Sequence, residues 1–195
     1  MQRLADPGQD DDSLMAAVAR GEAMALRWLL ERHGAAGFRL AWRLTGDAGE
    51  AEDLVQEAFA RLWRQAARWQ AGQAGVGAWL HRTVTNLAID RSRRKRPQTM
   101  ADLPDSIDPA PLADATLAGA DLATRIQGCV AALPDRQRAA IVLTYWEGLT
   151  GPMAAQALEI SPKAFESLLI RARMALKAVL VQAGIDPRDL PGDVS

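Results

Sequence analysis

The chain has 195 residues, enough for one medium or two small domains, and its 49% hydrophobic content excludes a mostly disordered protein. The formal net charge of -1 excludes a global positive field, so any binding to nucleic acid depends on local patches. The single cysteine, Cys129, excludes an internal disulfide, and with only His33 and His81 beside it there is no plausible set of zinc ligands. We therefore expect no metal and no cofactor.

The N-terminal segment MQRLADPGQDDD is acidic and polar, which is not the pattern of a secretory signal. No apolar run approaches the length of about 20 residues that a membrane span needs. We therefore expect a cytoplasmic protein that does not insert into a membrane.

Helical periodicity runs along the chain on both sides of one break, and strand-type alternation is nearly absent. The break is rich in proline and aspartate and holds no Lys or Arg between Arg96 and Arg125, which is typical of a flexible acidic tether. The sequence predicts an all-α protein with two small helical domains, 13–97 and 122–183, joined by a linker at 98–121. The expected helices are 12–20, 22–45, 49–68, 78–96, 121–132, 135–146, 151–158 and 162–183.

The helix over residues 51–63, AEDLVQEAFARLW, follows Asp47 and Glu50 at the spacing of a capping box. Its apolar stripe comprises Leu54, Val55, Ala58, Phe59 and Leu62. The opposite stripe comprises Asp53, Gln56, Glu57 and Arg64. Periodicity alone indicates only the solvated side of an amphipathic helix for these polar residues.

The helix over residues 79–97, WLHRTVTNLAIDRSRRKRP, ends in a run of arginines. Its packing face comprises Leu80, Thr83, Val84, Leu87 and Ala88. Its outward face comprises Arg82, Thr85, Asn86, Arg93 and Arg96. Local positive charge on a nearly neutral chain indicates a phosphate-backbone partner, although basic residues also suit a helix C-terminus without one.

Residues 135–180 have the pattern of helix, short turn and helix, in which the second helix can enter a major groove. Ser161 is expected to cap the last helix, with Pro162 at its first position. Its inward face comprises Phe165, Leu168, Leu169, Ala172 and Leu176. Its outward face comprises Lys163, Glu166, Ser167 and Ile170, with Arg171 and Arg173 on the flanks. This face can read bases and hold phosphates, or it can be the wet side of an ordinary helical hairpin.

Taken in order, these elements resemble a sigma-70-family RNA polymerase sigma factor of the extracytoplasmic-function (ECF) type, which has only regions 2 and 4. AEDLVQEAFARLW resembles region 2.2, GAWLHRTVTNLAIDRSRRKR resembles regions 2.3 and 2.4, and the segment from ALPDRQRAAIVLTYWEGLT through LLIRARMALK resembles region 4. The resemblance implies a region 2 helical bundle and a region 4 helix-turn-helix. It also implies an alternative sigma factor that binds core RNA polymerase at the beta-prime clamp and beta flap, directs promoter-specific transcription initiation, and is controlled by an anti-sigma factor.

The resemblance assigns three sets of contact residues. The polymerase clamp contacts are Asp53, Gln56 and Glu57. The candidates at the minus-ten element are Arg82, Asn86, Asp90, Arg93 and Arg94, with Asn86 expected to read a base because an amide both donates and accepts. The candidates at the minus-thirty-five element are Lys163, Glu166, Ser167, Arg171 and Arg173.

Several positions depart from the family pattern or allow two interpretations. The loop over 69–77 matches a segment that captures an unstacked base, but it is unusually rich in glycine. Trp79 is expected to anchor the core rather than to stack on a base. Glu159 stands where a turn glycine is common, at a cost of about 1 kcal/mol if the turn needs a positive φ. Gly151 and Pro152 replace a polar helix start, which a first helical turn tolerates.

Other functions fit the sequence less well. No nucleophile–base pair, paired acid or phosphate loop is visible, so no enzyme is expected. A sigma-like decoy, which binds an anti-sigma factor without touching DNA, would not need the basic run over 91–96. A helix-turn-helix repressor would need a dimer interface, and nothing outside the two lobes provides one.

Overall fold

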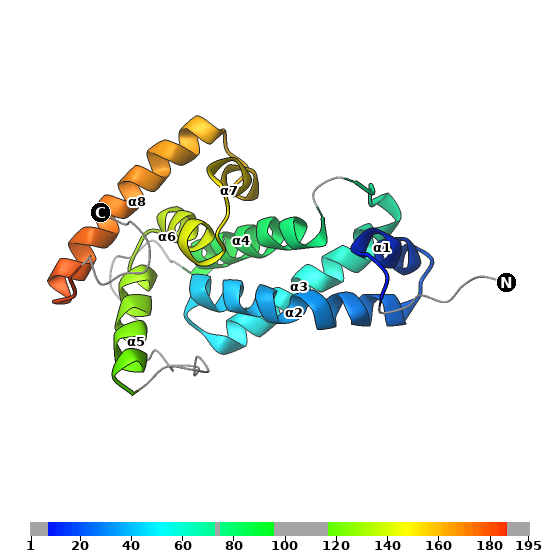
Figure 1. Cartoon of the computed structure of the whole chain (residues 1–195), viewed down its shortest axis with the longest axis horizontal. Coiled ribbons are helices and arrows are strands. Elements are labelled where there is room, and N and C mark those ends of the chain that lie inside the picture. The colour runs from blue at the N-terminus through cyan, green and yellow to red at the C-terminus, as the bar shows by residue number, and fades with distance from the viewer. Residues whose placement is uncertain (1–7, 73–74, 96–116, 187–195) are drawn as a thin grey trace.

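A computed structural model of the chain describes residues 8–72, 75–95 and 117–186 (Figure 1). Within these residues every regular element is helical, as predicted. The elements are α1 (Asp11–Ala19), α2 (Ala23–Thr45), α3 (Ala48–Gln65), η1 (Ala66–Arg68), α4 (Val76–Lys95), α5 (Leu117–Ala131), α6 (Asp135–Ile141), η2 (Val142–Trp146), α7 (Gly151–Ala157) and α8 (Pro162–Gln182).

The first lobe is built from α1 to α4. Helices α2, α3 and α4 pack against one another along their lengths, and α1 crosses one end of this bundle (Figure 1). The predicted cap of α3 is confirmed, because the Asp47 side chain accepts a hydrogen bond of 2.7 Å from the Glu50 amide. The predicted apolar stripe of α3 is buried, and it fixes which side of this helix faces outward.

The second lobe is built from α5 to α8. Helix α5 begins at Leu117 rather than at Asp121, so residues 117–121 of the predicted linker are helical. Pro111 is the last proline of the break, and the Leu- and Ala-rich sequence after it favours helix. The rest of the predicted linker lies outside the described residues. The helix predicted over 135–146 is interrupted at η2, a short π-helix. The backbone amide of Glu147 closes its last turn by donating to the Val142 carbonyl at 3.1 Å.

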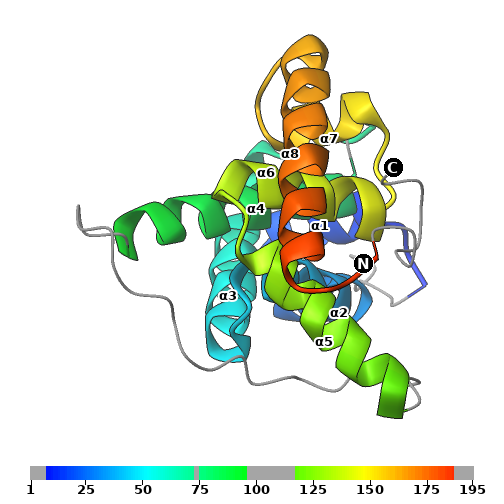
Figure 2. The same cartoon turned by 90° about the vertical axis from the view of Figure 1, so that its left-hand side faces the viewer.

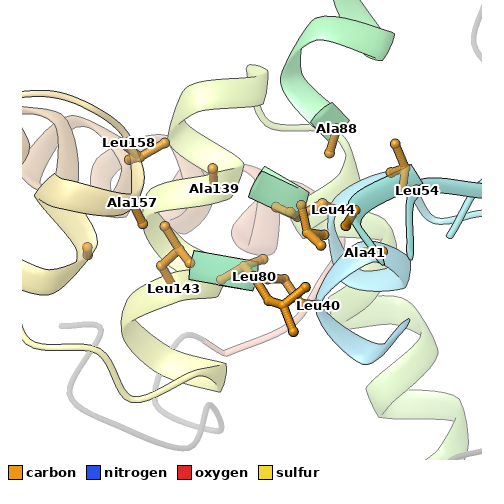
Figure 3. Close-up of a cluster of buried hydrophobic side chains, with 14 of the residues drawn as sticks. Leu40, Ala41, Leu44, Leu54, Leu80, Ala88, Ala139, Leu143, Ala157 and Leu158 are labelled. Carbon is orange, nitrogen blue, oxygen red and sulfur yellow. The ribbon is translucent and has the colours of Figure 1, made fainter. Parts of the chain in front are cut away.

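The two lobes share one continuous apolar core. Figure 3 shows side chains of α2 and α4, among them Leu44 and Leu80, next to side chains of α6, η2 and α7. Helix α7 packs on α4, and in Figure 2 α5 and α8 lie in front of the first lobe. The sequence predicts two lobes, and the structure adds that they are docked. No helix in the described part of the chain combines the length and apolarity needed to cross a bilayer.

Candidate nucleic-acid interface

The basic face of α4 is formed by residues spaced along one side of the helix. Arg82, Asn86, Asp90 and Arg93 fall within about 80° of one another at 100° per residue, and Arg94 lies further round. Asp90, Arg93 and Arg94 are exposed, whereas Arg82 and Asn86 are partly buried. The structure thus places four of the five candidates along one side of α4, from Arg82 in its first half to Arg93 near its C-terminal end, with Arg94 beside them.

Thr85 does not belong to this outward face. Helical periodicity predicts it there, but its side chain is fully buried and its hydroxyl has no hydrogen-bond partner among the described residues. Helix α4 packs against α2, α3, α6 and α7. The buried arc of α4 is therefore wider than that of a helix covered by one neighbour, and the periodicity of α4 alone cannot show this.

The basic end of α4 is tied to the acidic side of α3. Arg91 donates to the Asp53 carboxylate at 2.8 Å, and Lys95 pairs with Glu50. Asp53 nevertheless stays exposed, with 60% of its side-chain surface accessible. Exposed ion pairs of this kind contribute at most about 1 kcal/mol, so a binding partner can replace them.

The candidate polymerase contacts form a polar surface on α3. Gln56 is exposed, and Glu57 is half-exposed and accepts hydrogen bonds from Arg61 at 2.8 Å and Arg64 at 3.2 Å. The hydrogen bond from Arg61 holds the pKa of Glu57 below its usual range. Asp53, Gln56 and Glu57 therefore lie on one accessible side of α3, opposite its buried stripe, and Glu57 is a carboxylate at neutral pH.

Helix α8 presents an exposed polar face from its first turn. Ser161 caps it as predicted, accepting from the Ala164 amide at 3.2 Å, and Pro162 occupies the first turn. Lys163, Glu166 and Ser167 are exposed. These three side chains are therefore placed to meet a partner along the leading side of α8.

The two flanking arginines of α8 differ. Arg171 is exposed, and its Nε donates to the Ser167 carbonyl within the helix. Arg173 is partly buried, donates from Nε to the Tyr145 hydroxyl at 2.6 Å, and lies over the Tyr145 ring at 5.7 Å from the centroid. Arg173 therefore links α8 to η2, a contact that the sequence does not reveal because Tyr145 lies 28 positions away.

The turn between α7 and α8 requires a positive φ. Glu159 adopts φ = 54°, in the left-handed region that favours glycine. The turn therefore does need the positive φ that makes a residue other than glycine costly there, and it keeps its geometry although Glu159 replaces the glycine.

A cleft of about 960 Å³ lies between the lobes. Its first-lobe wall includes Arg68, Trp69 and Arg82, and Met153 and Gln156 of the second lobe face them. Indole rings and guanidinium groups are the side chains that proteins use to stack on bases and to neutralise phosphates. Trp79 borders the cleft but is buried, as expected of a core anchor.

Polar contacts reinforce the docking of the lobes. Glu147 is 11% exposed, accepts from Arg43 at 3.0 Å, and lies 3.2 Å from the His81 Nε2. Burial lowers the pKa of the Arg43 guanidinium, and the adjacent Glu147 carboxylate opposes that shift. The Glu147–Arg43 pair is not predictable from the sequence, because residues 104 positions apart leave no signal in periodicity.

Comparisons with known proteins identify the family of this chain. Family models named Sigma-70 region 2 and Sigma-70, region 4 match residues 29–98 and 123–176. The chain therefore belongs to the sigma-70 family.

Its relatives place it in the ECF group. It is 32% identical over 188 residues to the ECF RNA polymerase sigma factor SigE of Mycolicibacterium smegmatis, covering 91% of this chain and 71% of that protein. It is 35% identical over 173 residues to the ECF RNA polymerase sigma factor SigM of Mycobacterium tuberculosis, covering 88% and 85%. The solved structure of CnrH in complex with the cytosolic domain of CnrY is similar at a TM-score of 0.65 and 28% identity, covering 91% of this chain and 99% of that one.

Proposed function

We propose that this protein is an alternative sigma factor that binds core RNA polymerase and directs promoter-specific transcription initiation under the control of an anti-sigma factor. The observation that carries the proposal is the presence of two separate polar faces, on α4 and α8, in a member of the ECF group. The protein acts in the cytoplasm and has no catalytic activity of its own.

The face of α4 meets the minus-ten element. Arg93 and Arg94, exposed at the end of the helix, hold phosphates, and Asn86 reads a base edge through its amide. Asp90 lies beside them and can accept from a base amino group. Arg82 lines the first-lobe wall of the interlobe cleft together with Trp69.

The polar surface of α3 binds the polymerase clamp. Asp53, Gln56 and Glu57 are accessible on the side away from the core, and their ion pairs within the chain are of the weak, exposed kind. A basic surface on the partner can displace Arg91 from Asp53 without disturbing the bundle.

The face of α8 meets the minus-thirty-five element. Lys163, Glu166 and Ser167 lie near base edges, and exposed Arg171 holds a phosphate. Arg173 acts with Tyr145 to fix the angle between α8 and η2, so its effect on DNA binding is through orientation. Docking of the second lobe on α4 keeps the two DNA faces on one body before the polymerase binds.

The test is transcription in vitro with core polymerase, with and without the protein, on DNA upstream of its own gene. We expect a discrete transcript only when the protein is present. A variant with Arg93→Glu and Arg94→Glu serves as the matched control, because it should keep core binding and lose the transcript. The absence of a transcript from every template of a promoter library would contradict the sigma-factor function. Failure to bind core as well would favour the decoy, which binds an anti-sigma factor rather than polymerase or DNA.

A further inference from the structure

The interlobe cleft gathers positive charge without negative charge. Its volume of about 960 Å³ is at the upper end of the range of small-molecule sites. Arg68 of η1 and His81 and Arg82 of α4 line it, and no aspartate or glutamate is among the described residues that do so. The whole chain has a formal net charge of -1, so this excess of basic side chains is local. The lining therefore favours an anionic ligand.

Two of these basic side chains have no counter-charge. Over residues 8–72, 75–95 and 117–186, no carboxylate forms an ion pair with Arg68 or Arg82. Arg68 is exposed, whereas Arg82 is partly buried. Removing a guanidinium group from water without giving it an acceptor is unfavourable, and a bound anion supplies that acceptor. The two arginines are therefore placed to bind an anion on the first-lobe wall.

The carboxylates close to the cleft are already engaged. Glu147 lies 3.2 Å from the His81 Nε2, but it is only 11% exposed and also accepts from Arg43 at 3.0 Å. Asp12 accepts two hydrogen bonds from the turn that follows η1, at 2.8 and 2.9 Å. Neither acid belongs to the lining. These two acids therefore leave the guanidinium groups in the cleft unpaired.

The second lobe supplies the opposite wall of the cleft. Met153 and Gln156 of α7 line it and are exposed, and α7 packs against α4 (Figure 1). The side-chain amide of Gln156 can donate to an anion across the cleft. The Ser92 hydroxyl joins the lobes outside this lining, by donating to Asp135 at 2.7 Å. A ligand that fills the cleft therefore contacts both lobes and adds to the contacts that dock them.

We propose that the interlobe cleft binds a small molecule that carries two or more linked phosphate groups, and that the bound molecule holds the lobes together. Guanidinium groups match phosphate oxygens in charge and in geometry. Because the site needs both lobes, the ligand binds the docked protein and shifts the equilibrium away from separated lobes. In the proposed function, the ligand competes with the promoter strand for Arg82. That consequence rests on the proposed function, whereas the binding itself is a property of the free protein.

The variants change one wall of the site at a time. Arg68→Ala removes a guanidinium group from the first-lobe wall, and Gln156→Glu places a carboxylate on the second-lobe wall at nearly constant size. Arg27→Ala is the matched control, because this arginine of α2 is 67% exposed, pairs with Glu31 and does not line the cleft. It removes the same charge from the protein as Arg68→Ala. All three positions are exposed, so the fold should tolerate the changes.

The first measurement is isothermal titration calorimetry on the whole chain at about 0.15 M salt, where long-range attraction between exposed charges is screened. The probes are pyrophosphate, ADP and adenosine. We expect pyrophosphate and ADP to bind and adenosine not to bind. Equal affinities for the two phosphate-bearing probes indicate an inorganic oligophosphate, and tighter binding of ADP indicates a nucleotide. Arg68→Ala should weaken binding by about tenfold or more and Gln156→Glu should abolish it, whereas Arg27→Ala should bind like the wild type.

The second measurement tests whether the ligand holds the lobes together. Glu147→Ala removes the partner of Arg43 and is expected to separate the lobes. This variant should bind the tighter of the two phosphate-bearing probes more weakly than the wild type does, because its docked form is only a fraction of the population. Saturation with that probe should lower its radius of gyration in small-angle scattering toward the wild-type value, and adenosine at the same concentration should not.

Three results would overturn the inference. The first is a wild type that binds neither pyrophosphate nor ADP, or that binds adenosine as tightly as ADP. The second is wild-type binding in Arg68→Ala and Gln156→Glu, or an equal loss in Arg68→Ala and Arg27→Ala, since the anion then lies elsewhere. The third is a separated Glu147→Ala protein that stays expanded at saturating ligand. No polymerase or promoter takes part in these measurements, so failure of the proposed function, seen as the absence of a transcript, is distinguishable.

Discussion

Replacing Glu159 by glycine should stabilise the protein. Glu159 has φ = 54° in the turn between α7 and α8, and its side chain is exposed. A residue with a Cβ in the left-handed region destabilises the folded state by roughly 1–2 kcal/mol. Glycine removes this strain, but its greater conformational freedom in the unfolded chain offsets part of the gain. The net gain expected for Glu159→Gly is about 1 kcal/mol, or a rise in Tm of roughly 2–4 °C for a domain of this size.

Two further variants separate the backbone effect from the loss of a charge. Glu159→Ala removes the carboxylate but keeps a Cβ, so it should leave the free energy of unfolding within about 0.5 kcal/mol of the wild type. Gly46→Ala is the reverse change, because Gly46 ends α2 at φ = +74° and an added Cβ there would meet no atom within 4 Å. It should therefore destabilise the protein by about 1 kcal/mol through backbone strain alone.

The assay is equilibrium unfolding in urea, followed by circular dichroism, with the four proteins compared at one pH and salt concentration. Equal stabilities of Glu159→Gly and Glu159→Ala would refute the reasoning, because the gain would then come from the carboxylate. A Glu159→Gly protein less stable than the wild type would also refute it.

Three other outcomes follow from the structure. Asp53→Lys with Glu57→Lys should lower affinity for core polymerase while Tm and helicity stay unchanged, and unchanged capture of core by this variant would contradict the clamp assignment. Glu147→Ala leaves the largely buried Arg43 guanidinium unpaired, which costs about 3–5 kcal/mol unless the lobes separate. The radius of gyration from small-angle scattering should therefore rise. Glu31→Ala, which removes an exposed ion pair, should leave the radius of gyration unchanged. Arg171→Ala should weaken promoter binding equally on all minus-thirty-five sequences and reduce the salt slope by about 1, and a changed sequence preference would contradict its role as a phosphate contact.

Local signals were enough to predict the helices and the caps at Asp47 and Ser161. Each depends on neighbours within one or two turns, which the sequence contains directly. The accessible stripe of α3 was predictable for the same reason, because its apolar stripe packs on one side only. The start of α5 at Leu117 was missed because the acidic, proline-broken composition of the preceding segment outweighed a good helical sequence.

The docking of the lobes could not be predicted from periodicity. Burial of Thr85 depends on four helices surrounding α4, and the Arg43–Glu147 pair joins residues in different lobes. Arg173 looked like a free flanking cation, whereas it is held by Tyr145 across a π-helical turn. Contacts of this kind depend on tertiary structure, so they appear only once the helices are packed.

The central claim is that the faces of α4 and α8 read two separate promoter elements. The direct measurement is transcription in vitro by holoenzyme on a promoter library randomised at both elements, with the wild type, Asn86→Ala and Ser167→Ala compared. We predict that Asn86→Ala changes the preferred bases only in the minus-ten element and that Ser167→Ala changes them only in the minus-thirty-five element, with roughly 1–3 kcal/mol of discrimination at stake per base contact. Identical sequence rankings for all three proteins would contradict the claim.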